Sequence, residues 1–231
     1  MVVSLRELLD PGIVSDEEAI AIARQRAAMR ESFGPELARC VGEYLKSPHI
    51  AGGVVERGFI LVEAAVQPAH YRWLIRNGLL HDDPFVRSAA IELLSRQASN
   101  PGWIEKLAVD VDDRVRSGCV QALWRHSGEQ FEKTLHAATQ DINEVVAANA
   151  AYGLYLMSGE KSVEPIRKLA SHRIPAFRAA AAALIGRLDA GVRPQLLKPL
   201  LTDADPAVRR IAFQTLTAIK NAAQAATPVA A

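Results

Sequence analysis

The chain has 231 residues, of which 49% are hydrophobic and 23% are charged. This composition is typical of a soluble globular protein with ample material for a core. The formal net charge of +1 argues against a global basic field for nucleic acid, although a local basic stripe stays open. No segment is long and apolar enough to span a bilayer, and the first residues lack the apolar run of a signal peptide. We therefore expect a cytoplasmic protein with no membrane partner.

The two cysteines, Cys40 and Cys119, each lie within a helical pattern. They are better explained as small buried residues in a reducing compartment than as a disulfide. No pairing of cysteine and histidine has the spacing of a zinc site, so we expect no metal and no cofactor.

The first 48 residues predict a helical capping segment. Residues 5–9 suit a short helix, and Ser15 with Glu18 forms the pattern of a capping box that opens a longer one. Gly34-Pro35 should break or kink that helix before another runs over 36–45. Because this segment does not match the repeat that follows, it suits the end of a repeat array.

The stretch from Leu80 to Gln97 reads as a turn followed by a helix, and versions of it return down the chain. The apolar residue that opens each helix serves as its anchor, and the anchors are Val86, Val115, Val145, Phe177 and Val208. They are 29, 30, 32 and 31 residues apart. Arginine follows four of the five anchors, at Arg87, Arg116, Arg178 and Arg209, whereas Val146 follows the third. Such regular spacing predicts stacked supersecondary units.

Each unit is predicted to contain a first helix, a turn and a second helix. A degenerate copy at residues 50–66 extends the array to 49–220, and residues 221–231 are expected to form a flexible tail. The first helices are expected near 69–79, 101–109, 129–138, 162–171 and 191–201. The second helices are expected near 84–97, 113–127, 142–157, 175–188 and 206–220. Proline opens three second helices, where its missing N–H is not needed.

The motifs Asp83-Pro84-Phe85-Val86-Arg87, Asp113-Arg114-Val115-Arg116 and Asp205-Pro206-Ala207-Val208-Arg209 resemble the short HEAT-like repeats of phycobilisome-lyase-type proteins. The resemblance covers about residues 50–220 and implies an all-α fold. The implied fold is an armadillo-type, right-handed α-solenoid of about five to six helix pairs behind an N-terminal cap, with the second helices lining its concave surface. It is specific for fold and weak for activity, because such arrays serve scaffolds, inhibitors, lyases and DNA-repair enzymes alike. The third unit departs from the pattern at Val146 and Asn149.

The arginines that follow the anchors allow two interpretations. Six residues before each arginine position stands a polar or acidic residue: His81, Asp110, Gln140, His172 and Asp203. The arginines could therefore join the loops of neighbouring units and hold the stack in register. An anion-binding row is the functional alternative.

A second row lies ten residues after the anchors, at Arg96, Arg125, Tyr155 and Arg187. Its angle on the helix places it at the flank of the exposed face, either as a solvated edge or as a grip for a negatively charged strip. Trp124, Leu154 and Tyr155 further predict an apolar patch in the middle of the array. That patch either packs between helices or forms a groove for a partner, for which Trp, Tyr and Arg are the usual hot-spot residues.

Catalytic patterns are absent from the sequence: the six histidines are scattered, and no nucleophile elbow, P-loop or dinucleotide-binding glycine motif occurs. The leading hypothesis is a non-enzymatic module that holds a protein partner of unknown identity on the concave face, as a scaffold, adaptor or inhibitor. Its predicted contact residues are Arg96, Trp124, Arg125, Leu154, Tyr155 and Arg187. The resemblance leaves two alternatives open, namely a bilin lyase-like chromophore-handling subunit and a DNA-binding protein of the alkylpurine glycosylase type.

Overall fold

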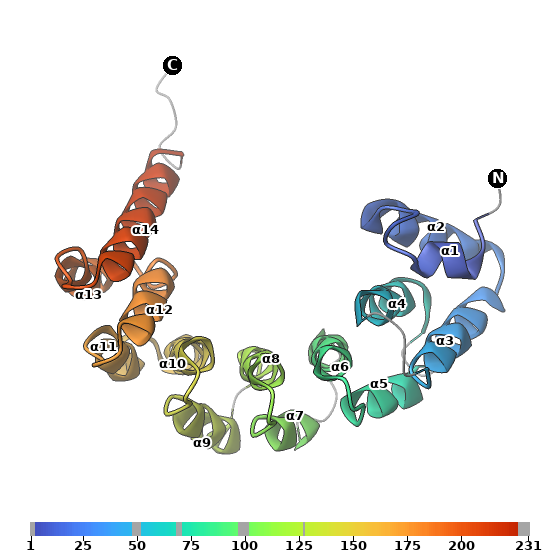
Figure 1. Ribbon diagram of the computed structural model, residues 1–231, viewed down its shortest axis with the longest axis horizontal. Helices are drawn as coiled ribbons and strands as arrows, with labels where there is room; N and C mark the ends of the chain where they lie inside the picture. The colour runs from blue at the N-terminus through green and yellow to red at the C-terminus, as the bar shows by residue number, and fades with distance from the viewer. Residues whose placement is uncertain (1–2, 48–51, 68–70, 97–101, 127, 226–231) are drawn as a thin grey trace. The chain divides into compact units, whose positions relative to one another are not determined.

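The computed structural model describes residues 3–47, 52–67, 71–96, 102–126 and 128–225. Within these residues all regular structure is helical (Figure 1). The α-helices are α1 (Leu5–Leu9), α2 (Asp16–Met29), α3 (Phe33–Tyr44), α4 (Gly52–Ala65), α5 (Arg72–Leu79), α6 (Pro84–Arg96), α7 (Gly102–Leu107), α8 (Asp113–Leu123), α9 (Glu129–Ala138), α10 (Glu144–Ser158), α11 (Glu164–Ala170), α12 (Pro175–Ile185), α13 (Arg193–Leu200) and α14 (Pro206–Ala225). A short 3-10 helix, η2 (Gly159–Ser162), follows α10.

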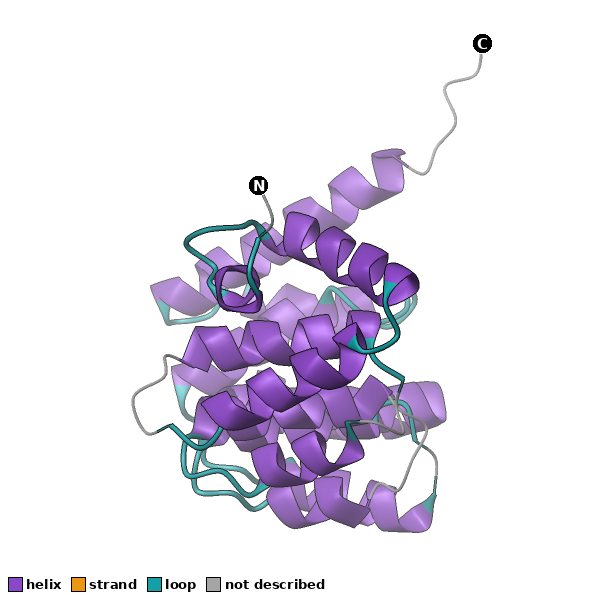
Figure 2. Cartoon of the chain, turned by 90° about the vertical axis from the view of Figure 1, so that its right-hand side faces the viewer, coloured by secondary structure: helices purple, strands orange, loops and turns teal. Residues whose placement is uncertain are grey.

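The helices are joined by short loops, and the described residues contain no strand (Figure 2). From α5 onward they form first-and-second pairs whose bounds agree closely with the predicted ranges. The described chain is therefore an all-α repeat fold of the α-solenoid class. None of its described helices has the length and apolar character needed to cross a membrane.

The chain divides into two compact units, Met1–Ala122 and Leu123–Ala231. This division falls inside the predicted array, and the boundaries at 48 and 49 remain predictions from sequence. One part of the expected tail is corrected: residues 221–225 continue helix α14. The remaining tail residues lie outside the described part of the chain.

The N-terminal helices differ in two details from the sequence prediction. The complete capping box belongs to α1, where the Ser4 hydroxyl accepts from the Glu7 N–H at 3.2 Å and the Glu7 carboxylate accepts from the Ser4 N–H at 2.6 Å. For α2, the Ser15 hydroxyl accepts from the Glu18 N–H at 3.3 Å. Helix α2 ends at Met29, before Pro35 is reached, so Pro35 does not kink it. Pro35 lies in the first turn of α3, where the N–H that proline lacks would have no partner within the helix.

The burial of residues in α10 shows that the anchor of the third repeat lies one residue later than the sequence predicted. Val145 is 50% exposed, whereas Val146 is fully buried, so the anchor of this helix is Val146. The anchors then lie 29, 31, 31 and 31 residues apart. The position four residues after the anchor becomes small and fully buried in every pair, at Ala90, Cys119, Ala150, Ala181 and Ala212. With the anchor on Val146, the third repeat follows the pattern more closely than the sequence analysis predicted.

Candidate partner-binding site

The turn between the helices of each pair is closed by one side chain. This side chain accepts a hydrogen bond from the backbone N–H two residues later, over 2.9–3.2 Å. The acceptors are His81 Nδ1, Asp110 Oδ1, Asp141 Oδ1, His172 Nδ1 and Asp203 Oδ1. The third of them is Asp141, where the sequence analysis placed Gln140, which confirms the corrected register of α10.

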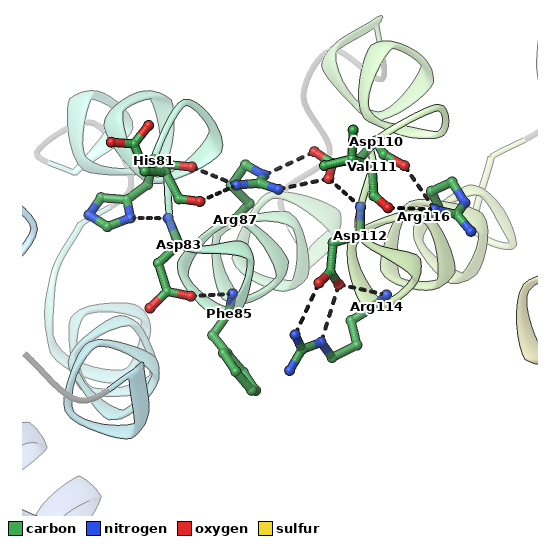
Figure 3. A network of polar contacts seen from close by, with 10 residues as sticks. His81, Asp83, Phe85, Arg87, Asp110, Val111, Asp112, Arg114 and Arg116 are labelled. Carbon is green, nitrogen blue, oxygen red and sulfur yellow. Dashed lines mark hydrogen bonds and ion pairs between the residues drawn. The ribbon is translucent and has the colours of Figure 1, made fainter.

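The arginine after the anchor donates hydrogen bonds to the backbone carbonyls of the same turn. Arg87 Nη1 donates to the carbonyls of His81 and Asp82 at 2.8 Å each (Figure 3). The guanidinium groups of Arg116, Arg178 and Arg209 make the equivalent pair of bonds to their own turns.

Arg87 and Arg178 also reach the next helix pair. Arg87 forms a two-pronged ion pair with Asp110, and Arg178 forms one with Asp203. The hydrogen bond from Arg178 is the main reason that the pKa of Asp203 lies below its usual value. For Asp110, burial is the largest single influence and opposes ionisation, but the hydrogen bonds and charge of Arg87 and the hydrogen bond from the Asp112 backbone N–H together outweigh it, and the pKa is again lowered. These contacts support the interpretation of the first arginine row as a stacking device.

The second row of predicted site residues is changed by the corrected register. Ten residues after the anchors now stand Arg96, Arg125, Leu156 and Arg187. Leu156 is 47% exposed, whereas Leu154 and Tyr155 are only 1% and 5% exposed. Leu154 takes the core position eight residues after its anchor, so it and Tyr155 are not surface anchors as predicted.

Tyr155 has a structural partner. Its hydroxyl donates to Asp189 Oδ2 at 2.6 Å and accepts from the Asp189 backbone N–H at 3.3 Å. Burial, followed by the bond to the Asp189 carboxylate, raises the pKa of this phenol. Tyr155 therefore ties α10 to the loop after α12.

Arg96, in the first unit, has two acidic partners. Its guanidinium forms ion pairs with Glu63 and Glu92. Burial lowers the pKa of Arg96, but the bonds from the two carboxylates outweigh it and raise the pKa. Its charge is therefore largely neutralised within the unit.

An aromatic and cationic cluster occupies the corresponding surface of the second unit. The indole of Trp124 meets the ring of Tyr152 edge-on, with 5.0 Å between centroids and 84° between planes. The Arg187 guanidinium lies 5.8 Å from the centroid of Tyr152. Trp124 Nε1 donates to the Asn149 carbonyl at 3.0 Å, which fixes the indole. Gly153 makes room for it, because a Cβ there would stand 2.8 Å from Trp124 Cδ1.

A surface hollow of about 500 Å³ lies beside this cluster. Trp124, Arg125, Leu156 and Met157 contribute to its wall. An exposed leucine, an exposed arginine and the edge of an indole are contact types that protein interfaces favour. Among the described residues, no group of three histidine, cysteine or carboxylate side chains is arranged to hold a metal ion.

Sequence reasoning missed Leu156 because it placed the third anchor on Val145, and it missed Tyr152 because that residue stands outside the two rows that were considered. A usable signal was present. Asp141-Ile142-Asn143 matches Asp110-Val111-Asp112 and Asp203-Ala204-Asp205 in the turns before α8 and α14. Aligning these turns would have set the anchor on Val146.

The match to a family model agrees with this repeat geometry. A family model described as HEAT repeats matches residues 131–216. No curated protein matches the chain. Among solved structures, a designed armadillo repeat protein in complex with the peptide (KR)4 is similar, at 15% identity and a TM-score of 0.36, over 93% of this chain and 97% of its own. The family match therefore identifies HEAT repeats within residues 131–216, and the same turn contacts recur around α6 and α8.

Proposed function

We propose that the protein is a non-enzymatic binding module that holds a protein partner on the second-helix surface of its C-terminal unit. The contact residues would be Trp124, Arg125, Tyr152, Leu156 and Arg187, named here the aromatic–arginine surface. The observation that carries this proposal is the ordered cluster of Trp124, Tyr152 and Arg187 beside the exposed Leu156.

Pre-organisation supports binding at this surface. Trp124 is held by the bond to Asn149 and by its contact with Tyr152, so little side-chain freedom remains to be lost when a partner docks. Rigid aromatic side chains flanked by arginines are the residue types that dominate binding energy in protein interfaces. Arg96 remains a candidate contact in the first unit, with a smaller role because Glu63 and Glu92 neutralise its charge.

The test compares affinity capture by the wild type with capture by the triple variant Arg125→Glu, Leu156→Asp, Arg187→Glu. All three side chains are exposed, so the fold should be kept. The matched control is Val145→Asp, Lys198→Glu, Lys220→Glu, which makes the same charge changes at exposed positions of the same unit. Circular dichroism should show equal helicity for all three proteins.

We expect the wild type and the control to capture the same protein, and the triple variant to bind it about tenfold more weakly. Equal capture by the triple variant would contradict the site. Co-purification of a visible pigment, or of nucleic acid with a steep salt dependence, would favour the lyase-like or the DNA-binding alternative instead.

A further inference from the structure

A larger groove lies elsewhere on the C-terminal unit, over the first helices α9 and α11 and the turns that follow them. Its volume is about 910 Å³, at the upper end of the range for ligand pockets. It shares no lining residue with the aromatic–arginine surface. Its role is therefore separate from the contacts described above.

Part of the groove lining is apolar. Leu169 and Phe177 are buried members of the core that line it. Ile142 and Ile174 are exposed residues of its two turns. Ile142 occupies the tip of the turn before α10, where burial within the unit cannot explain an isoleucine. The groove thus offers apolar contact area to a ligand.

Three cations surround this apolar strip. Lys161, Lys168 and Arg173 are exposed, and none of them has an ion pair with another described residue. The acidic lining residues are already occupied: Glu164 pairs with Arg167 at 2.6 Å, and Asp141 closes its own turn. The charge left for a ligand is therefore positive.

The charge of the whole unit points the same way. Residues 123–231 contain 13 lysines and arginines against 9 aspartates and glutamates, a formal charge of +4. Residues 1–122 contain 14 against 17, a formal charge of −3. The small net charge of the chain therefore conceals a basic C-terminal unit, whose field favours the approach of acidic partners.

We propose that this groove binds an extended acidic segment of a partner protein, in which carboxylates alternate with apolar side chains. The carboxylates would pair with Lys161, Lys168 and Arg173, and the apolar side chains would lie on Ile142, Leu169 and Ile174. An open groove lined by three exposed cations and by apolar side chains suits a chain segment better than a compact anion, which needs converging donors.

The experiment presents a display library of random dodecapeptides to the full chain. Parallel selections use the groove variant Lys161→Glu, Lys168→Glu, Arg173→Glu and the control Lys133→Glu, Lys198→Glu, Lys220→Glu. Both variants change the charge of the unit equally, but only the first changes the groove. Selected peptides are then measured by fluorescence anisotropy, including against Ile142→Ser and against the triple variant of the aromatic–arginine surface.

We expect the wild type to select peptides rich in Asp, Glu and large apolar residues. The groove variant should bind these peptides about tenfold or more weakly than the wild type does, and Ile142→Ser should also bind them more weakly. The control and the variant of the aromatic–arginine surface should bind them as the wild type does, so this result is independent of the proposed function. The proposal would be overturned if the wild type selected basic or neutral peptides, or no peptide. It would also be overturned if the groove variant and the control lost affinity for the selected peptides equally. Self-association of the chain that the groove variant abolishes would also overturn it, by showing that a second copy occupies the groove.

Discussion

The guanidinium of Arg87 and the carboxylate of Asp110 meet in a two-pronged ion pair, with Nε to Oδ2 at 2.9 Å and Nη2 to Oδ1 at 2.7 Å (Figure 3). Arg87 belongs to α6, whereas Asp110 closes the turn of the next helix pair. The remaining Arg87 nitrogen binds its own turn. One side chain therefore fixes a turn and its neighbour in a single rigid arrangement, and Arg178 with Asp203 repeats this in the C-terminal unit.

Removing Arg178 should destabilise the C-terminal unit. The side chains of Arg178 and Asp203 are only 15% and 9% exposed, so Arg178→Ala leaves a mostly buried carboxylate and two turn carbonyls without their donor. We expect the free energy of unfolding to fall by about 3 kcal/mol. Urea denaturation followed by circular dichroism measures this. Arg173→Ala, which removes an exposed arginine from the same turn, should change it by less than about 0.5 kcal/mol.

Acid should remove the benefit of the same ion pair. Because the bond from Arg178 holds the pKa of Asp203 below its usual value, the pair stabilises the fold fully above the unfolded-state pKa of about 3.9. This contribution is lost as the pH falls through the lower, folded-state pKa. The stability gap between wild type and Arg178→Ala should therefore be constant from neutral pH down to about 5 and narrow below about 4. A gap that stays constant in acid would show that Asp203 does not carry the effect.

Helix α12 should gain stability from an N-cap that it lacks. Asp83, Asp112, Asn143 and Asp205 cap their second helices by accepting from backbone N–H groups, whereas Ile174 has no side-chain cap. We expect Ile174→Asn to raise the free energy of unfolding by about 1 kcal/mol. Thermal and urea unfolding should both report the increase, and Ile174→Ala should not reproduce it.

Two helical glycines should respond oppositely to alanine. A Cβ at Gly118 would meet only ordinary contacts, at 3.5 Å from Ser88 Oγ, so Gly118→Ala should stabilise the protein by up to about 1 kcal/mol. A Cβ at Gly153 would stand 2.8 Å from Trp124 Cδ1 and must displace the indole.

We therefore expect Gly153→Ala to cost about 1–3 kcal/mol and to shift the tryptophan fluorescence as the bond from Trp124 to Asn149 is strained. Urea denaturation and emission spectra of the two variants provide the comparison. Stabilisation by both alanines would show that the indole has room to move.

The sequence by itself determined the repeat, the class of fold and the position of each helix pair from α5 onward, with several helix ends displaced by three to five residues. These features depend on local rules: apolar periodicity, a proline at the start of a helix and an acidic cap before it. The arginine row could be interpreted correctly from sequence as well, because Arg87 and Asp110 recur at a fixed spacing in successive units.

The tertiary structure decided which residues of α10 are exposed. Val145 and Val146 are the same residue type, and the arginine that marks the register elsewhere is replaced by Ala147, so within the helix itself the sequence does not distinguish the two valines, and only the preceding turn does. A shift of one residue turns a helix by about 100°. That rotation buries Leu154 and Tyr155 and exposes Leu156. Packing against neighbouring helices sets this rotation, so the tertiary structure decided which side chains form the candidate site.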